Sequence, residues 1–131
     1  VCAHLGLTPQ SVMKLGGFRV QGREEAAAGR LRADALAVQE AGAAMLVLEC
    51  VPRALAAEVT RSLDIPVIGI GAGVGCDGQV LVMHDMLGLN KGFSPRFLRR
   101  YANLFDEITQ AVQSYINDVK RADFPSEEES Y

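Results

Sequence analysis

One carboxylate in this sequence stands among apolar residues, where its environment could support proton transfer. Glu49 lies between the apolar run 45–48 and the pair Cys50-Val51. An ionised carboxylate is costly to bury alone, so it must be paired, partly hydrated or shifted toward its neutral form. Such a group suits a general base. A buried ion pair with a basic residue of an upstream part of the protein is an equally open alternative.

Other polar residues also end apolar runs. His4 interrupts the first apolar run of the chain, as either a hydrogen-bonded structural histidine or a substrate contact beside Glu49. His84 and Asp85 close a strand that we expect over 80–85. Neighbouring residues of a strand point to opposite faces, so only one of the two could face a site. This favours a structural role for the pair.

The remaining motifs carry weaker signals. Residues 73–78 match GxGxxG, but the acidic residue that a dinucleotide site needs about twenty positions later is absent. A tight turn that lets the backbone approach a ligand is the better interpretation. Arg19 and Arg23 flank a loop and are either solvated or contacts of an anionic ligand. No Ser/His/Asp triad or metal-ligand cluster is visible in the sequence.

Composition and charge exclude several classes of protein. The 131 residues are 49% apolar and 22% charged, with a net charge of −3, so neither nucleic acid nor an anionic membrane is expected as a partner. No apolar run approaches the roughly 18 residues of a membrane span. The three cysteines lack zinc or disulfide spacing, which favours reduced thiols and a cytoplasmic location. The chain opens directly in an apparent strand without Met, so we expect further chain upstream.

Apolar periodicity predicts the elements that must position these residues. Nearly continuous apolar runs are typical of strands buried on both faces. Thr8 and Pro9 predict a short helical turn that ends near Leu15. We expect strands at 1–7, 44–51, 65–71 and 80–85, and helices at 23–42, 52–64 and 94–122.

This alternation of strand and helix, about four times, predicts a parallel sheet with crossover helices. A complete (βα)8 barrel needs about 250 residues, so four units correspond to about half of one. In a barrel, Glu49 would lie at the mouth, where catalytic side chains gather. A small doubly wound sheet is the alternative.

Five ordered segments resemble the 3-methyl-2-oxobutanoate (ketopantoate) hydroxymethyltransferase family. They are 4–11 (HLGLTPQS), 16–23 (GGFRVQGR), 46–52 (LVLECVP), 65–73 (IPVIGIGAG) and 77–85 (DGQVLVMHD). The resemblance spans nearly the whole chain. It implies a (βα)8 TIM barrel of the phosphoenolpyruvate/pyruvate superfamily. Residues 1–123 would form strands five to eight and the C-terminal helices, and 124–131 an exposed tail.

The resemblance also implies a reaction. A hydroxymethyl group would pass from 5,10-methylenetetrahydrofolate to 3-methyl-2-oxobutanoate (α-ketoisovalerate), giving ketopantoate in the first step of pantothenate biosynthesis. Glu49 corresponds to the family's catalytic proton acceptor, and His4 to a histidine beside the bound product. The family's Mg²⁺ ligands lie on its first four strands, which have no counterpart here. We therefore expect an N-terminal half as partner, a homodecamer as the assembly, and no activity from this chain alone.

Two alternative functions stay open. One is another carbon–carbon lyase or transferase of the same superfamily, against which the LECVP segment at 48–52 argues. The other is a non-catalytic half-barrel fragment.

Overall fold

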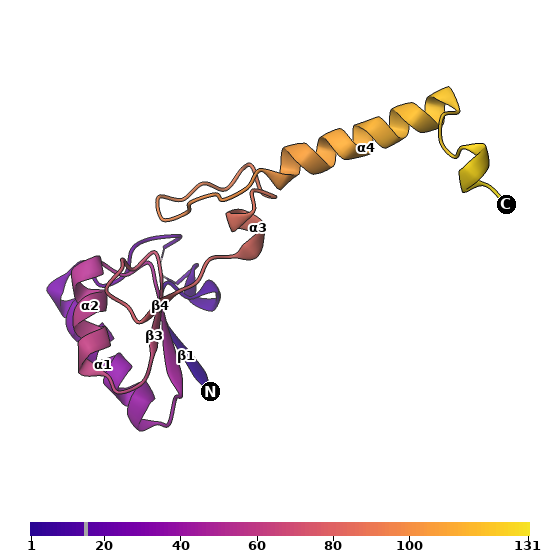
Figure 1. Cartoon of the computed structure of the whole chain (residues 1–131). Helices are drawn as coiled ribbons and strands as arrows, with labels where there is room; N and C mark the ends of the chain where they lie inside the picture. Colours follow the sequence, from indigo (N-terminus) through magenta and orange to yellow (C-terminus); the bar gives the residue numbers. More distant parts are fainter. Residues whose placement is uncertain (15) are drawn as a thin grey trace. The chain divides into compact units, whose positions relative to one another are not determined.

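The computed structural model describes residues 1–14 and 16–131 (Figure 1). The chain divides into two compact units, Val1–Leu81 and Val82–Tyr131. The predicted end of the first helical turn, at Leu15, lies outside the described residues. None of the helices in the described part of the chain is long and apolar enough to cross a membrane.

The first unit is built on a parallel four-stranded sheet in the order β1-β2-β3-β4. Its strands are β1 (Cys2–Gly6), β2 (Met45–Glu49), β3 (Val67–Ile70) and β4 (Gly78–Gln79). A parallel sheet with helices confirms the predicted α/β class and is consistent with part of a barrel. The placement as strands five to eight stays a prediction.

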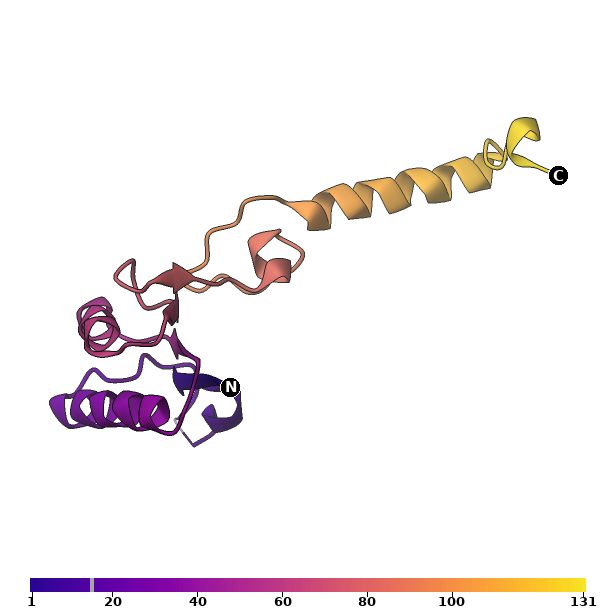
Figure 2. The same cartoon turned by 60° about the horizontal axis from the view of Figure 1, so that its bottom comes forward.

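Two long helices lie on the same side of this sheet, α1 (Glu25–Glu40) and α2 (Arg53–Ser62) (Figures 1 and 2). The short 3₁₀ helix η1 (Pro9–Ser11) follows β1. Helices and strands share one apolar core, because each buries its apolar side against the other. Burying one such large aliphatic side chain stabilises the fold by about 1.5–3 kcal/mol. The core residues are Ala28, Leu31, Ala35, Leu46, Leu48, Val51, Leu55, Ala56, Val59, Val67 and Ala72.

The two faces of β2 differ in burial. Leu46 and Leu48 have no exposed surface and pack in the core, whereas Val47 and Glu49 are partly exposed and Met45 is 38% exposed. This alternation is the period of two that a strand imposes on its side chains. Glu49 therefore lies on the sheet face away from the core that α1 and α2 share.

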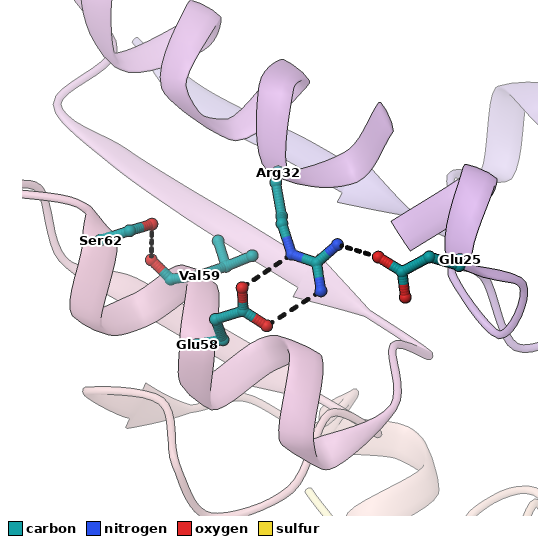
Figure 3. Close-up of polar contacts among 5 residues, drawn as sticks. All are labelled: Glu25, Arg32, Glu58, Val59 and Ser62. Carbon is teal, nitrogen blue, oxygen red and sulfur yellow. Dashed lines mark hydrogen bonds and ion pairs between the residues drawn. The ribbon is translucent and has the colours of Figure 1, made fainter. Parts of the chain in front are cut away.

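One arginine joins the two long helices (Figure 3). Arg32 of α1 donates hydrogen bonds of 2.7 and 3.1 Å to the two carboxylate oxygens of Glu58 on α2. Its remaining terminal nitrogen donates to Glu25 at 2.9 Å. The hydrogen bonds from Arg32 hold the pKa of Glu58 below its usual range. A bidentate pair fixes geometry as well as charge, so it sets how α1 and α2 lie against each other.

Most predicted elements of the first unit are confirmed within two or three residues. The helix expected over 23–42 is α1, and Gly42 takes a φ of +88° just beyond its end. That conformation is a common way to end a helix and is open to glycine without strain. The segments 44–51 and 65–71 contain β2 and β3.

The strand predicted over 80–85 is wrong. Pairing ends after β4, and Met83–Met86 forms the short helix α3 of the second unit. The amides of Asp85 and Met86 both donate to the carbonyl of Val82, which closes a helical turn instead of a strand ladder. His84 and Asp85 thus share a helical turn, and the argument from opposite strand faces does not apply to them.

The helix predicted from residue 94 begins ten residues later, as α4 (Leu104–Arg121). The apolar spacing before Leu104 predicted a helix, but side-chain hydrogen bonds and not helical main-chain ones hold that segment. The guanidinium of Arg100 donates to the carbonyls of Asn90, Lys91 and Phe93 at 3.0–3.3 Å. Beyond α4, the residues 124–131 are exposed and contain the 3₁₀ helix η2 (Glu127–Glu129).

We predict that Arg32→Lys lowers the melting temperature at neutral pH and low salt, because lysine cannot form the bidentate pair. The folded-state pKa of Glu58 is lowered, so this stabilisation is present above the ordinary glutamate pKa of about 4.3 and is lost as the pH falls below it. The difference from the parent should therefore vanish in acid and shrink in high salt. Thermal melts by circular dichroism measure this, with Arg30→Lys on the same helix as the control. A difference that persists in acid contradicts the ion pair as its cause.

Candidate active site

The pairing of β1 with β2 brings His4 and Glu49 together. In this register His4 lies opposite Val47, and Gly6 lies opposite Glu49. The two polar side chains meet on the sheet face away from the helices, with His4 Nε2 at 3.1 Å from Glu49 Oε2. The structure thus joins the two residues that the sequence singled out separately.

This pair is partly open to solvent. The side chain of His4 is 33% exposed and that of Glu49 is 23% exposed. The Nε2 atom itself is buried, and it has no aligned hydrogen bond to any group in the described part of the chain. The separation suits an ion pair if the imidazole is protonated, but the carboxylate lies off the direction in which a ring N–H points. The carboxylate therefore accepts no hydrogen bond from His4 Nε2.

Main-chain hydrogen bonds fix the end of β2. The carbonyl of Glu49 accepts from the amide of Leu7, at 2.9 Å, and the amide of Cys50 donates to the carbonyl of Ile70, also at 2.9 Å. The carbonyl of Cys50 in turn accepts from the amide of Gln21 at 2.8 Å. Neighbouring strands and the loop before α1 therefore hold the backbone on both sides of the carboxylate.

Cys50 has an unusual backbone conformation for its residue type. Its φ is +51°, in the left-handed region that non-glycine residues rarely occupy. Such strain costs about 1–3 kcal/mol and often marks functional sites. Burial raises the pKa of the Cys50 thiol, and the charge of Glu49 raises it further. This turn could not be predicted from residue type, since a cysteine is not a residue that predicts a positive φ.

A cavity of about 430 Å³ lies against β1, the segment that follows it, and α1. His4 lines it, but Glu49 does not, so the cavity and the His4–Glu49 pair share one residue. Its lining includes side chains of both charge signs: the basic Lys14 and Arg30, and the acidic Asp34. Sequence reasoning missed these residues because they come from a loop and a helix surface, where charged side chains are ordinary.

Other predicted candidates lie apart from this pair or have structural roles. Arg19 and Arg23 line a second hollow with Phe18 and Val20. In the glycine-rich segment, Asp77 accepts a hydrogen bond from the amide of Val67 at 2.8 Å, which ties the loop to β3.

The resemblance implies a Mg²⁺ ion whose ligands lie on strands that have no counterpart in this chain. Within residues 1–14 and 16–131, no group of three or more His, Cys, Asp or Glu side chains is arranged to hold one. The residues present here therefore do not make a divalent-cation site by themselves. Cys2, Cys50 and Cys76 are free thiols.

Comparison with known proteins places this geometry in context. The sequence model of the family described as ketopantoate hydroxymethyltransferase matches residues 1–127. Proteins named 3-methyl-2-oxobutanoate hydroxymethyltransferase are 64% identical in Parabacteroides distasonis, 56% in Syntrophus aciditrophicus and 57% in Bdellovibrio bacteriovorus, each over 131 residues. All of this chain is covered in each case, but only 48%, 48% and 50% of the relatives. The chain spans about half the length of the curated relatives it matches.

We predict that Cys50 is alkylated slowly at mildly alkaline pH and that Glu49→Gln speeds its reaction. The thiolate is the reactive form, and removing the neighbouring negative charge lowers the thiol pKa toward its usual range. Burial is the larger cause of the raised pKa, so the variant should recover only part of the reactivity. Mass spectrometry of iodoacetamide-treated peptides follows each cysteine, and the exposed Cys2 serves as an internal control. An unchanged Cys50 rate in the variant would show that Glu49 carries no charge near the thiol.

Proposed function

Because the chain belongs to the ketopantoate hydroxymethyltransferase family, we propose that it supplies the general base of a 3-methyl-2-oxobutanoate hydroxymethyltransferase. Glu49 is that base. The observation that carries the proposal is the position of this carboxylate: it ends a buried parallel strand, is partly exposed, and makes no aligned hydrogen bond with the nearby His4. Catalytic side chains at the carboxyl ends of parallel strands are typical of barrel enzymes.

The chemistry requires a base at this point. A hydroxymethyl group can join C3 of 3-methyl-2-oxobutanoate only after that carbon has lost a proton. Glu49 would accept this proton, and the electron pair of the broken C–H bond would form the enolate with the 2-oxo group. The enolate carbon then bonds to the one-carbon unit of 5,10-methylenetetrahydrofolate, and the two C–N bonds that join this unit to the folate break. Water supplies the hydroxyl, and the two folate nitrogens take up one proton from water and the proton removed from C3, which gives ketopantoate and tetrahydrofolate. General-base catalysis of the first step contributes about 10²–10⁴-fold.

We propose that His4 contacts the bound keto acid. Its ring is 3.1 Å from the Glu49 carboxylate, so a substrate that presents C3 to Glu49 lies within reach of the imidazole. His4 also lines the cavity beside β1. Its role is to orient the substrate, since proton removal is assigned to Glu49.

The resemblance supports several further proposals. Mg²⁺ would be held by an N-terminal half that corresponds to the unmatched part of the relatives, and when bound it would polarise the 2-oxo group as a Lewis acid. A homodecamer, inactivity of this chain alone and a role in pantothenate biosynthesis rest on the same resemblance, and a cytoplasmic location rests on the spacing of the cysteines.

The decisive test uses a chimaera in which this chain replaces the matching 48% of the Parabacteroides distasonis relative. We predict that Glu49→Gln lowers deuterium exchange at C3 of 3-methyl-2-oxobutanoate by at least about 10²-fold, because the amide cannot accept the proton. Exchange is followed by proton NMR, and binding of the keto acid should survive. Glu40→Gln, an exposed carboxylate at the end of α1, is the matched control.

The competing explanation for Glu49 gives the opposite pattern. If the residue is only an ion-pair partner of His4, Glu49→Gln should lower stability while the folded fraction keeps its exchange rate. Measuring exchange and thermal stability on one preparation separates the two. Normal exchange in folded Glu49→Gln sinks the assignment of the base.

The metal proposal predicts a difference between the chain and the chimaera. Titration of Mg²⁺ into the isolated chain should show no specific site by calorimetry, because the described residues supply no ligand cluster. The chimaera should bind Mg²⁺ and lose product formation in a chelator. Saturable Mg²⁺ binding by the isolated chain contradicts the placement of the ligands in the other half.

A further inference from the structure

The ends of β1 and β2 lie unusually close to each other beside Glu49. Gly6, the last residue of β1, is the register partner of Glu49, the last residue of β2. A Cβ atom at Gly6 would overlap the carbonyl oxygen of Glu49. It would also lie 2.9 Å from Cγ2 of the buried Val51 and 3.2 Å from the carbonyl carbon of Glu49. No side chain fits between the two strand ends without moving the Glu49 peptide group.

This close approach of the two strand ends allows a main-chain hydrogen bond to the Glu49 carbonyl. The next residue after Gly6 is Leu7, whose amide donates to the Glu49 carbonyl at 2.9 Å. Leu7 is itself buried, with 3% of its surface exposed, so the amide has little freedom to follow a displaced carbonyl. A methyl group at Gly6 would therefore push the Glu49 carbonyl away from its donor.

We infer that Gly6 is a positioning residue for the Glu49 carboxylate, which rests on the proposed role of Glu49 as the base. The absence of a side chain lets the Leu7 amide hold the Glu49 carbonyl, and the main chain thereby sets where the carboxylate points. The side chain itself contributes little to its own placement, since His4 Nε2, 3.1 Å from its carboxylate, makes no aligned hydrogen bond with it. Displacement of a reacting group by about 1 Å can cost about 10²-fold in rate.

The backbone angle of Gly6 offers a second, purely conformational reason for glycine. Its φ is +89°, so any L residue there is strained whatever the space around it. Gly42, in the turn between α1 and β2, separates the two effects. It has nearly the same φ, +88°, but a Cβ there would meet nothing within 4 Å. Gly42→Ala therefore reproduces the conformational strain without the overlap.

The experiment compares Gly6→Ala, Gly42→Ala and Glu49→Gln in the same chimaera. Rates of deuterium exchange at C3 are measured per folded molecule, together with the melting temperature and the KM for 3-methyl-2-oxobutanoate. We expect both alanine variants to lose stability, and Gly6→Ala alone to lose about 10²-fold in the exchange kcat, with little change in KM. A purely structural role predicts equal exchange rates per folded molecule in the two alanine variants, and that result overturns the inference.

The same comparison separates failure of the inference from failure of the proposed function. If Glu49→Gln loses exchange but folded Gly6→Ala keeps it, the base stands and the positioning role falls. If Glu49→Gln keeps exchange, both fall. Should Gly6→Ala yield no folded protein, an ester in place of the Gly6–Leu7 peptide bond removes the N–H donor without adding an atom. It should reproduce the loss of kcat, and parental exchange in the ester variant overturns the inference.

Discussion

The register of β1 against β2 is the constraint on which the site depends. With Gly6 opposite Glu49, both His4 and Glu49 lie on the face of the sheet away from the helices. A shift of β2 by one residue along its neighbours would turn every side chain of the strand to the other face. The carboxylate would then enter the apolar core, and Leu48 would leave it. Burial of the leucines therefore enforces the position of the one charged group in the strand.

The candidate base is held mainly by backbone groups. The amide of Leu7, just after β1, and the carbonyl of Ile70 on β3 bind the two ends of the peptide group between Glu49 and Cys50. The Glu49 carboxylate lies 3.1 Å from His4 Nε2. Hydrogen-bond donors aligned with a carboxylate would compete with a substrate proton for its lone pairs. A carboxylate without such donors can accept that proton more readily. The strained Cys50 that follows is part of the same arrangement, because its amide and carbonyl bind different segments.

The sequence predicted those parts of the structure in which local pattern and burial agree. Apolar runs gave β2 and β3, three- and four-residue spacing gave α1, and Glu49 was conspicuous because its neighbours are apolar. The errors arose where hydrogen bonds that the apolar pattern does not indicate decide the structure. They are the bonds from Arg100 to the carbonyls of Asn90 and Phe93, and the helical turn that the Val82 carbonyl closes after β4. The contact between Gly6 and Glu49 could not be read from the sequence, because strand register joins positions that are distant along the chain.

The closeness of the two strand ends has a consequence for how relatives can exchange segments. β1 and β2 together determine the position of the carboxylate. A recombination crossover between Gly6 and Glu49 therefore joins a β1 end from one parent to a β2 end from the other. Such a hybrid keeps the site only if both parents share the same interstrand spacing and a bare backbone at this point. A crossover outside residues 6–49 transfers the two strand ends together, so this segment is best exchanged as a whole.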